Sequence, residues 1–227
     1  MKKISKNVTI VDHVLVQEAL ACLRDRNTPV TKFRVGLIDI GRLYAILLAP
    51  TFKATVTGIT TPLGPAKGVE ITDRDRMVLV AVLRAAIPLI EGFQRIFPEA
   101  KLGFISARRL EASQEDKGDS PQFPIEISYV NIPPIRENTV VIIGDPMLAT
   151  GSTMLKILDN IKNHGKPRRL IVLSIVSTEL GLNRVIQEHP DVEIYTAVID
   201  PELNKYGYII PGLGDAGQRA FIRPFED

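Results

Sequence analysis

The 227-residue sequence has a single cysteine, Cys22, and only three histidines, His13, His164 and His189. One cysteine allows no disulfide within the chain and is typical of a protein from a reducing compartment, so we expect a cytoplasmic location. The histidines lie far apart and have none of the spacings that hold a zinc ion. The sequence therefore predicts neither a disulfide scaffold nor a dedicated zinc site.

Long apolar runs and a strong charge of one sign are also missing. No run approaches the roughly 18 apolar residues that a membrane-spanning helix needs, and the basic start Met1-Lys-Lys is followed by no apolar signal core. The net charge is only +2, which gives no reason to expect a protein that coats nucleic acid or a membrane surface. We therefore expect no nucleic-acid partner and no membrane contact, and any anion site must come from a local cluster.

What the sequence does have is a regular alternation of apolar runs with helical patterns. Buried strands are predicted by the runs at 77–83, 101–106, 140–143, 170–176 and 192–198, and amphipathic helices lie between them. A short strand and a helix are expected within residues 1–27, and a long helix between Thr28 and Leu48. This order favours a doubly wound, mostly parallel α/β sheet, and the length fits one domain, 1–227.

Residues 51–72 break that pattern, because apolar and polar side chains alternate there with a period of two. We interpret this segment as an extended β-hairpin arm. Arms of this composition often pair with another chain, so a homo-oligomer, dimer or tetramer, is one expectation. The alternative is a hairpin folded onto its own domain.

The most informative stretch runs from Val140 to Thr153. Four apolar residues are followed by Gly144-Asp145-Pro146, by the small residues Thr150-Gly-Ser-Thr153, and then by a helical pattern. A strand, a tight turn and a helix place backbone N–H groups beside hydroxyl donors, which is an anion site suited to a phosphate monoester. Asp145 lies where the strand ends, and its carboxylate suits ribose hydroxyls or a phosphate-bound Mg²⁺.

Arginines follow two of the other predicted strands. Arg84 comes directly after the strand at 77–83, and Arg108-Arg109 follow the strand at 101–106. Ligands of such sheets lie at the carboxyl ends of strands, where guanidinium groups bind phosphate oxygens bidentately. The polar, aperiodic segment 108–121 is expected to be a mobile loop that closes over a ligand.

The C-terminal segment 200–227 contains a glycine-dense loop, Tyr206-Gly-Tyr-Ile-Ile-Pro-Gly-Leu-Gly-Asp-Ala-Gly217. Gly212, Gly214 and Gly217 formally match a dinucleotide fingerprint, but that motif needs a strand before it and a helix with a later acidic residue after it. Only ten residues follow Gly217, so the fingerprint is rejected. A loop of this composition instead lets backbone approach a flat ligand.

The run Asp145-Pro-Met-Leu-Ala-Thr-Gly-Ser-Thr153 resembles the 5-phosphoribosyl diphosphate (PRPP) signature of phosphoribosyltransferases, in the form of the uracil phosphoribosyltransferase family. Most other branches carry two adjacent acidic residues here, whereas Gly144 precedes a single Asp145. The loop at 206–217 is similar to the uracil-recognition loop of the same family. The resemblance runs from about Thr28 to Phe221.

The resemblance implies the residue roles. Asp145, Arg84 and Arg109 are expected to serve catalysis, and uracil is expected to meet Ile209, Gly214, Asp215 and Ala216 in a C-terminal hood. PRPP is expected to bind Arg84, Arg109, Asp145, Pro146, Met147, Leu148, Ala149, Thr150, Gly151, Ser152, Thr153 and Asp215. Mg²⁺ is expected as a cofactor carried by PRPP, without a protein site of its own. The sequence departs from the family pattern at Ala86, where Gly is usual, at Arg108, where an aromatic is common, and at Gln218, where Asp is usual.

The activity implied is uracil phosphoribosyl transfer: uracil and PRPP give UMP and diphosphate, a step of pyrimidine salvage. GTP and CTP are the nucleotide effectors to consider. Two alternatives stay open, a phosphoribosyltransferase for another base and a non-catalytic regulator that senses PRPP or a nucleotide. Gly144 argues against a purine enzyme, and the low net charge does not favour an RNA-binding regulator.

Overall fold

The protein is built on an eight-stranded sheet, seen in a computed structural model that describes residues 1–109 and 124–223. The strands follow in the order β1 (Lys2–Lys3), β2 (Val8–Ile10), β12 (Val192–Thr196), β10 (Arg169–Leu173), β8 (Val140–Gly144), β5 (Met77–Leu83), β6 (Lys101–Arg109) and β7 (Ile125–Asn131). From β2 to β6 all neighbours are parallel, while β1 and β7 add an antiparallel strand at each edge. The expected mostly parallel sheet is confirmed.

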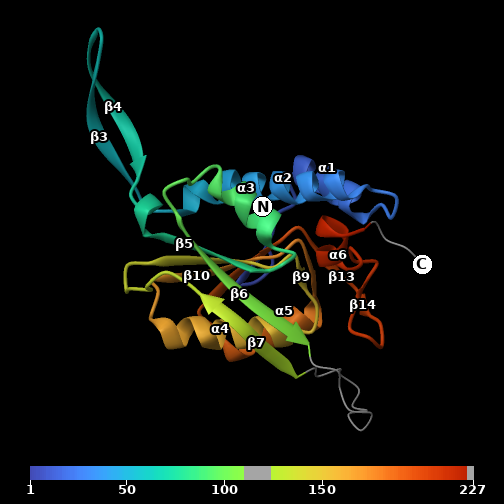
Figure 1. Cartoon of the computed structure of the whole chain (residues 1–227). Helices are drawn as coiled ribbons and strands as arrows, with labels where there is room; N and C mark the ends of the chain where they lie inside the picture. The colour runs from blue at the N-terminus through green and yellow to red at the C-terminus, as the bar shows by residue number, and fades with distance from the viewer. Residues whose placement is uncertain (110–123, 224–227) are drawn as a thin grey trace.

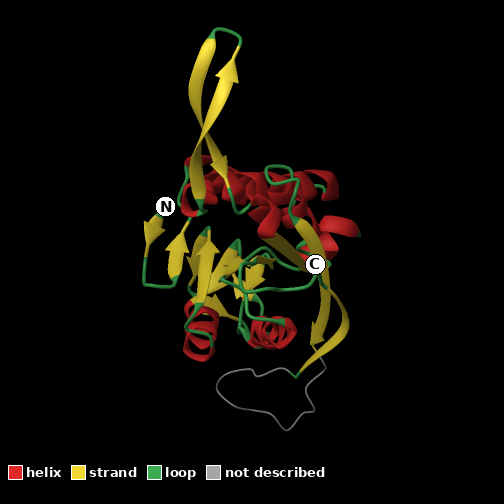
Figure 2. Ribbon diagram, turned by 90° about the vertical axis from the view of Figure 1, so that its left-hand side faces the viewer, coloured by secondary structure: helices red, strands yellow, loops and turns green. Residues whose placement is uncertain are grey.

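Helices cover both faces of this sheet (Figure 1 and Figure 2). One face carries α1 (Val14–Arg24), α2 (Val30–Leu48) and α3 (Ile87–Gln94), and the other carries α4 (Ser152–His164) and α5 (Glu179–Glu188). The short helix α6 (Ala216–Phe221) packs against α2. Because both faces are covered, the central strands β5, β8 and β10 are almost wholly apolar and buried.

Two of the predicted strands are each divided in two. The strand expected at 170–176 ends at Leu173 and resumes as β11 (Val176–Thr178), and that at 192–198 ends at Thr196 and resumes as β13 (Val198–Asp200). Ser174 lies at the first break: its N–H donates to the Tyr195 carbonyl of β12, whereas the next two N–H groups, of Ile175 and Val176, donate to the Pro146 carbonyl. The resumed strands form a second parallel sheet in the order β13-β11-β9, in which β9 is Met147–Leu148.

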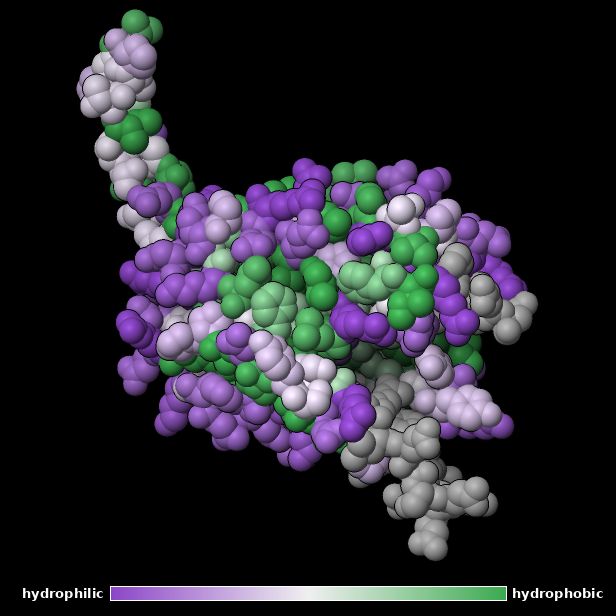
Figure 3. Space-filling model, in the orientation of Figure 1, coloured by the Kyte–Doolittle hydropathy of each residue, from purple (hydrophilic) through white to green (hydrophobic). Residues whose placement is uncertain are grey.

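The hairpin predicted at 51–72 extends away from the body (Figure 1). Its strands β3 (Ala54–Thr61) and β4 (Gly64–Ile71) pair antiparallel, between the short 3-10 turns η1 (Ala49–Thr51) and η2 (Arg74–Arg76). The structure therefore favours an arm over a hairpin folded onto its own domain. Apolar side chains on the arm are exposed, as Figure 3 shows, among them Val56, Ile59, Leu63 and Val69.

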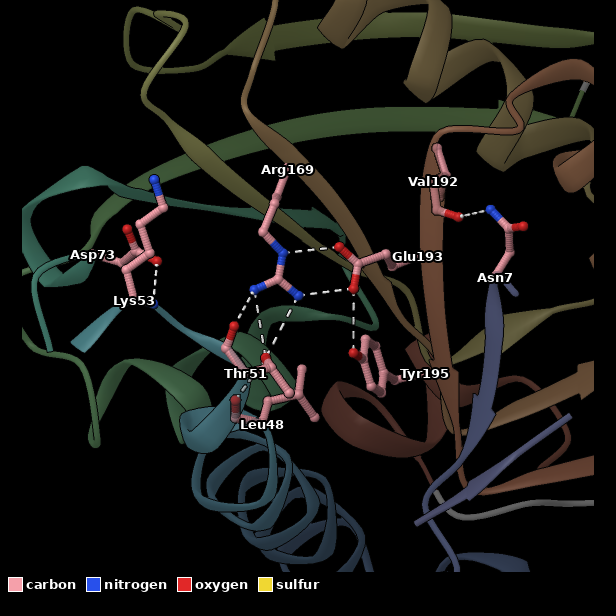
Figure 4. A network of polar contacts seen from close by, with 9 residues as sticks. All are labelled: Asn7, Leu48, Thr51, Lys53, Asp73, Arg169, Val192, Glu193 and Tyr195. Atoms are coloured by element: carbon pink, nitrogen blue, oxygen red, sulfur yellow. Dashed lines mark hydrogen bonds and ion pairs between the residues drawn. The ribbon is translucent and has the colours of Figure 1, made fainter. Parts of the chain in front are cut away.

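The base of the arm is fastened to the sheet by two arginines. Arg169 of β10 bonds to both carboxylate oxygens of Glu193 at 2.8 Å and to the carbonyl of Thr51 at 2.8 Å (Figure 4). Arg168 pairs at 2.7 Å with Asp73, a fully buried carboxylate that also accepts the Lys53 N–H. A two-stranded hairpin has little stability alone, so these contacts fix its direction.

Two expectations near β6 change with the structure. Arg108 and Arg109 end strand β6 and do not begin a loop, because β7 pairs with them antiparallel. The rest of the loop predicted at 108–121 lies outside the described residues.

Within 1–109 and 124–223, none of the helices combines the length and apolarity needed to cross a membrane.

Candidate active site

A cavity of about 310 Å³, the central cavity, lies at the carboxyl ends of β5 and β8. Four segments of the sequence line it: the end of β5 with the turn after it, β6 at Ala107, the Asp145 turn (residues 145–153) and the C-terminal loop (residues 206–217). Its walls include Leu83, Ala85, Asp145, Met147, Ala149, Thr153, Tyr208, Ile209 and Asp215. This is the edge of the sheet where parallel α/β folds bind ligands.

The Asp145 turn leads into helix α4 through Gly151, whose φ of +79° lies in the left-handed region that favours glycine. No side chain caps the helix, and the first bond back to the turn runs from the Leu155 N–H to the Gly151 carbonyl at 2.9 Å. Thr153 precedes that bond and is one of the residues that line the central cavity. An uncapped helix start of this kind binds anions.

The hydroxyl residues of this turn do not all face the central cavity. Thr153 lines it, whereas Thr150 is buried and its hydroxyl donates to the Ser152 oxygen at 3.1 Å. The Ser152 hydroxyl also accepts a bond from Arg184 of α5 at 3.3 Å. Both residues line a different cavity from the central one. Pro146, Leu148 and Gly151 are buried within the turn. Thr153 is therefore the hydroxyl placed to meet a ligand in the central cavity.

Asp145 follows β8 directly and is half-buried at the cavity wall. Its N–H donates to the Leu173 carbonyl at 3.0 Å, and its Oδ1 accepts the Met147 N–H at 3.4 Å. The backbone on both sides of Asp145 is thus held by neighbouring strands. The carboxylate is presented from a rigid support.

The two predicted arginine positions are less completely defined. Arg84 follows β5 in a turn with a cis Leu83–Arg84 peptide, its side chain is exposed, and no described residue pairs with it. Arg109 ends β6 opposite Ile125, and its side chain lies outside the described residues. Arg108 forms an ion pair with Glu126 across the β6–β7 pair. Arg84 itself does not line the central cavity, but its sequence neighbours Leu83 and Ala85 do.

The C-terminal loop forms the opposite wall. Strands β14 (Glu202–Leu203) and β15 (Ile209–Ile210) pair antiparallel, and the chain then passes a cis Ile210–Pro211 bond into α6. Ile209 and Asp215 reach the central cavity, and the Asp215 carboxylate caps α6 by accepting the Gln218 N–H. Gly214 instead lines an adjoining cavity of about 470 Å³, and Ala216 is fully buried.

Buried charges that the sequence analysis did not single out hold this loop. Asp200 at the end of β13 accepts the Gly212 N–H at 2.9 Å and pairs with Arg24 of α1 at 2.7 Å. Arg219 of α6 donates to the carbonyls of Leu23, Leu213 and Asp25. Burial lowers the pKa of the Arg219 guanidinium from its ordinary value. The only signal in the sequence was that Asp200, like Asp145, closely follows a predicted strand.

The described part of the chain gathers no three histidine, cysteine or acidic side chains that could hold a metal ion. The Asp145 carboxylate on the cavity wall is of the donor type that Mg²⁺ takes when phosphates supply most of the coordination. These residues fit a metal that arrives with a phosphorylated ligand.

Comparisons with known proteins agree with this site. The family profile described as Uracil phosphoribosyltransferase matches residues 10–222. The uracil phosphoribosyltransferase of Pyrobaculum arsenaticum is 46% identical over 214 residues, which cover 94% of this chain and 98% of that protein. The enzyme of the same name from Methanothermobacter thermautotrophicus is 45% identical, with 95% of each chain covered.

A solved structure has the same fold over nearly the whole chain. The AQ2163 protein from Aquifex aeolicus superposes with a TM-score of 0.84 at 27% identity, covering 96% of this chain and 100% of that one. The fold, the two sequence motifs and these relatives lead to one assignment. The chain belongs to the uracil phosphoribosyltransferase family.

Proposed function

We propose that this protein, as a single domain, transfers the 5-phosphoribosyl group of PRPP to uracil and releases UMP and diphosphate. The observation that carries the proposal is the central cavity, where the Asp145 turn and the C-terminal loop face one space. In this reaction N1 of uracil bonds to C1 of the ribose, the bond from C1 to the diphosphate oxygen breaks, and N1 loses its proton. The electron-poor ribose and the leaving diphosphate need charge stabilisation more than acid–base groups.

PRPP is held along the Asp145 turn. The 5′-phosphate lies at the start of α4, where Thr153 lines the cavity and offers an N–H and a hydroxyl, and Asp145 holds the ribose hydroxyls. Arg84 and Arg109 neutralise the diphosphate, and Asp215 faces PRPP from the opposite wall. The remaining residues of 145–153 shape the turn with their backbone.

A Mg²⁺ ion brought in by PRPP would neutralise the charge that develops on the leaving diphosphate. In this chain Asp145, which lines the central cavity, is the carboxylate that would hold this metal or the ribose beside it.

Uracil binds at the C-terminal loop. Its N3–H donor and two carbonyl acceptors match backbone groups of Ile209, Gly214 and Ala216, and Asp215 lies beside them. The position of Ile209 between the central cavity and the adjoining cavity supports this placement, because both border the same loop.

The arm supports a homo-oligomer. Val56, Ile59, Leu63 and Val69 are 48–100% exposed on a hairpin that leaves the body, and a partner chain would bury them. Replacing residues 54–71 by a short Gly-Ser linker should yield a smaller particle in sedimentation, whereas an unchanged mass would rule out the arm as the contact.

We also propose a cytoplasmic location, supported by the single cysteine, and regulation by GTP or CTP, supported by the family resemblance alone. Titrating either nucleotide into the enzyme at fixed PRPP and uracil tests the regulation. A rate that stays constant removes it.

The reaction itself is tested by incubating the protein with PRPP, Mg²⁺ and uracil and separating the products by chromatography. UMP and diphosphate should appear in equal amounts. Diphosphate without UMP would mean hydrolysis, and neither product would contradict the proposal.

A further inference from the structure

The small parallel sheet β13-β11-β9 connects the two halves of the central cavity. Strand β9 contains Met147 and Leu148 of the Asp145 turn, and β13 ends at Asp200. Between them lies β11, whose Val176 pairs with Met147 on one side and Val198 on the other. The register of these strands fixes Asp200 relative to the Asp145 turn.

Asp200 in turn holds the C-terminal loop. Its side chain is 5% exposed, its Oδ2 accepts the Gly212 N–H at 2.9 Å, and its Oδ1 pairs with Arg24 Nη2 at 2.7 Å. Charge-assisted bonds of this length to a buried carboxylate are strong and directional. They set where the backbone of Gly212 lies.

The backbone of Gly212 in turn contacts the backbone of Ile209. The Gly212 φ is +58°, and a Cβ atom there would stand 2.2 Å from the Ile209 carbonyl oxygen, so the two backbones are in direct contact. Ile209 lines the central cavity. The contacts therefore run without interruption from Asp200 through Gly212 to the cavity wall.

We propose that Asp200 is a positioning residue that fixes the C-terminal loop relative to the Asp145 turn and thereby determines the affinity for uracil. The inference rests on the proposed base site. Asp200 lines neither the central nor the adjoining cavity, so its removal should move the loop while the Asp145 turn keeps its own supports from Thr178 and Arg184.

The chain offers a matched control in Asp73 at the base of the arm. Asp73 is 0% exposed, pairs with Arg168 Nη2 at 2.7 Å and accepts the Lys53 N–H at 2.9 Å. The two carboxylates thus have the same kinds of partner at the same distances, but Asp73 lies away from the central cavity. A general loss of stability should therefore appear in variants of both residues. A displaced C-terminal loop should appear only in variants of Asp200.

The test measures KM for uracil, the Kd for PRPP by calorimetry and the thermal midpoint for Asp200→Ala and Asp73→Ala. We expect Asp200→Ala to raise the KM for uracil by roughly 10- to 100-fold, with the Kd for PRPP within about twofold of wild type. Asp73→Ala should lower the thermal midpoint and leave both constants unchanged. Asp200→Asn, which keeps an acceptor for Gly212, should give a smaller rise in the same direction and decides the question if the alanine variant does not fold.

The positioning role is overturned if the KM for uracil in the Asp200 variants changes no more than in Asp73→Ala, or if the Kd for PRPP rises in parallel. Gly214→Val separates this outcome from a failure of the base site. If Gly214→Val alone abolishes uracil use, the base site stands and the role of Asp200 is wrong. If neither variant affects uracil, the base site itself is wrong.

Discussion

Gly181 at the start of α5 touches Ala149 of the Asp145 turn: a Cβ atom on Gly181 would stand 2.2 Å from the Ala149 carbonyl oxygen. The same carbonyl accepts the Thr178 hydroxyl at 2.7 Å. Helix α5 therefore supports the turn from behind, and the shape of the turn depends on a residue outside the motif.

Gly181→Ala should displace the Asp145 turn, because the new Cβ atom would stand 2.2 Å from the Ala149 carbonyl oxygen and one of the two backbone segments must move to relieve the clash. We expect the Kd for PRPP to rise at least about 10-fold and the free energy of unfolding to fall by about 1–3 kcal/mol. Calorimetry and urea denaturation measure both. Asn183→Ala, at an exposed position of the same helix, is the control and should change neither.

Thr153→Ala removes the hydroxyl that lines the central cavity and leaves the strand and helix intact. PRPP binding should weaken by roughly 1–3 kcal/mol with little change in thermal stability. Thr150→Ala should do the reverse, because the Thr150 hydroxyl is buried and bonds to Ser152. Equal PRPP affinity in Thr153→Ala and wild type would remove the 5′-phosphate from this turn.

Asp145→Asn keeps the size of the side chain and removes the charge to which we assign contact with the ribose or the metal. We expect kcat to fall by at least about 100-fold while circular dichroism and the thermal midpoint stay near wild type. A kcat within about twofold of wild type at saturating Mg²⁺ and PRPP would show that the role given to Asp145 is wrong.

Much of the fold could be predicted because its signals are local. The apolar runs of β5 and β8 and the helical periods between the strands depend on neighbouring residues, as does the alternation in the arm. The breaks at Ser174 and between β12 and β13 could not be predicted, since they coincide with contacts between distant segments: Ile175 bonds to the Pro146 carbonyl, and Ala197 bonds to the Ile175 carbonyl. The apolar runs at 170–176 and 192–198 each predict one continuous strand.

The site divides in the same way. Asp145, Thr153 and Ile209 were found from motifs, and the structure brings them to one cavity. Asp200, Arg24 and Arg219 were missed because their partners are backbone groups and charges up to 196 residues away in the sequence. No spacing rule links such positions. That Thr150 and Ser152 turn away from the cavity also depends on Arg184, which sequence patterns do not place.

Tyr44→Phe tests a buried bond between the helices and the sheet. The Tyr44 hydroxyl donates to the Ser174 carbonyl at 2.7 Å, and burial raises the pKa of Tyr44 well above its ordinary value. We expect the variant to lose about 1 kcal/mol in the free energy of unfolding at about pH 8. Because the folded pKa is raised, the advantage of the wild type is complete below about pH 10, where unfolded tyrosine ionises, and declines above it. Denaturation of both proteins at about pH 8 and above about pH 10 measures the difference in the free energy of unfolding. A wild-type advantage that grows above about pH 10 would contradict this sign.

The central claim is that the C-terminal loop selects uracil for transfer from PRPP bound at the Asp145 turn. The most direct measurement is the rate of diphosphate release with PRPP, Mg²⁺ and each of uracil, 5-fluorouracil, thymine, cytosine, hypoxanthine and guanine. Uracil and 5-fluorouracil share the same donor pattern and should react well, and thymine should react poorly because its methyl group collides with the loop. The kcat/KM for uracil should exceed that for cytosine by roughly 10⁴-fold, since cytosine leaves buried polar groups unpaired, and the purines should not react. A higher kcat/KM for hypoxanthine or guanine than for uracil would contradict the account.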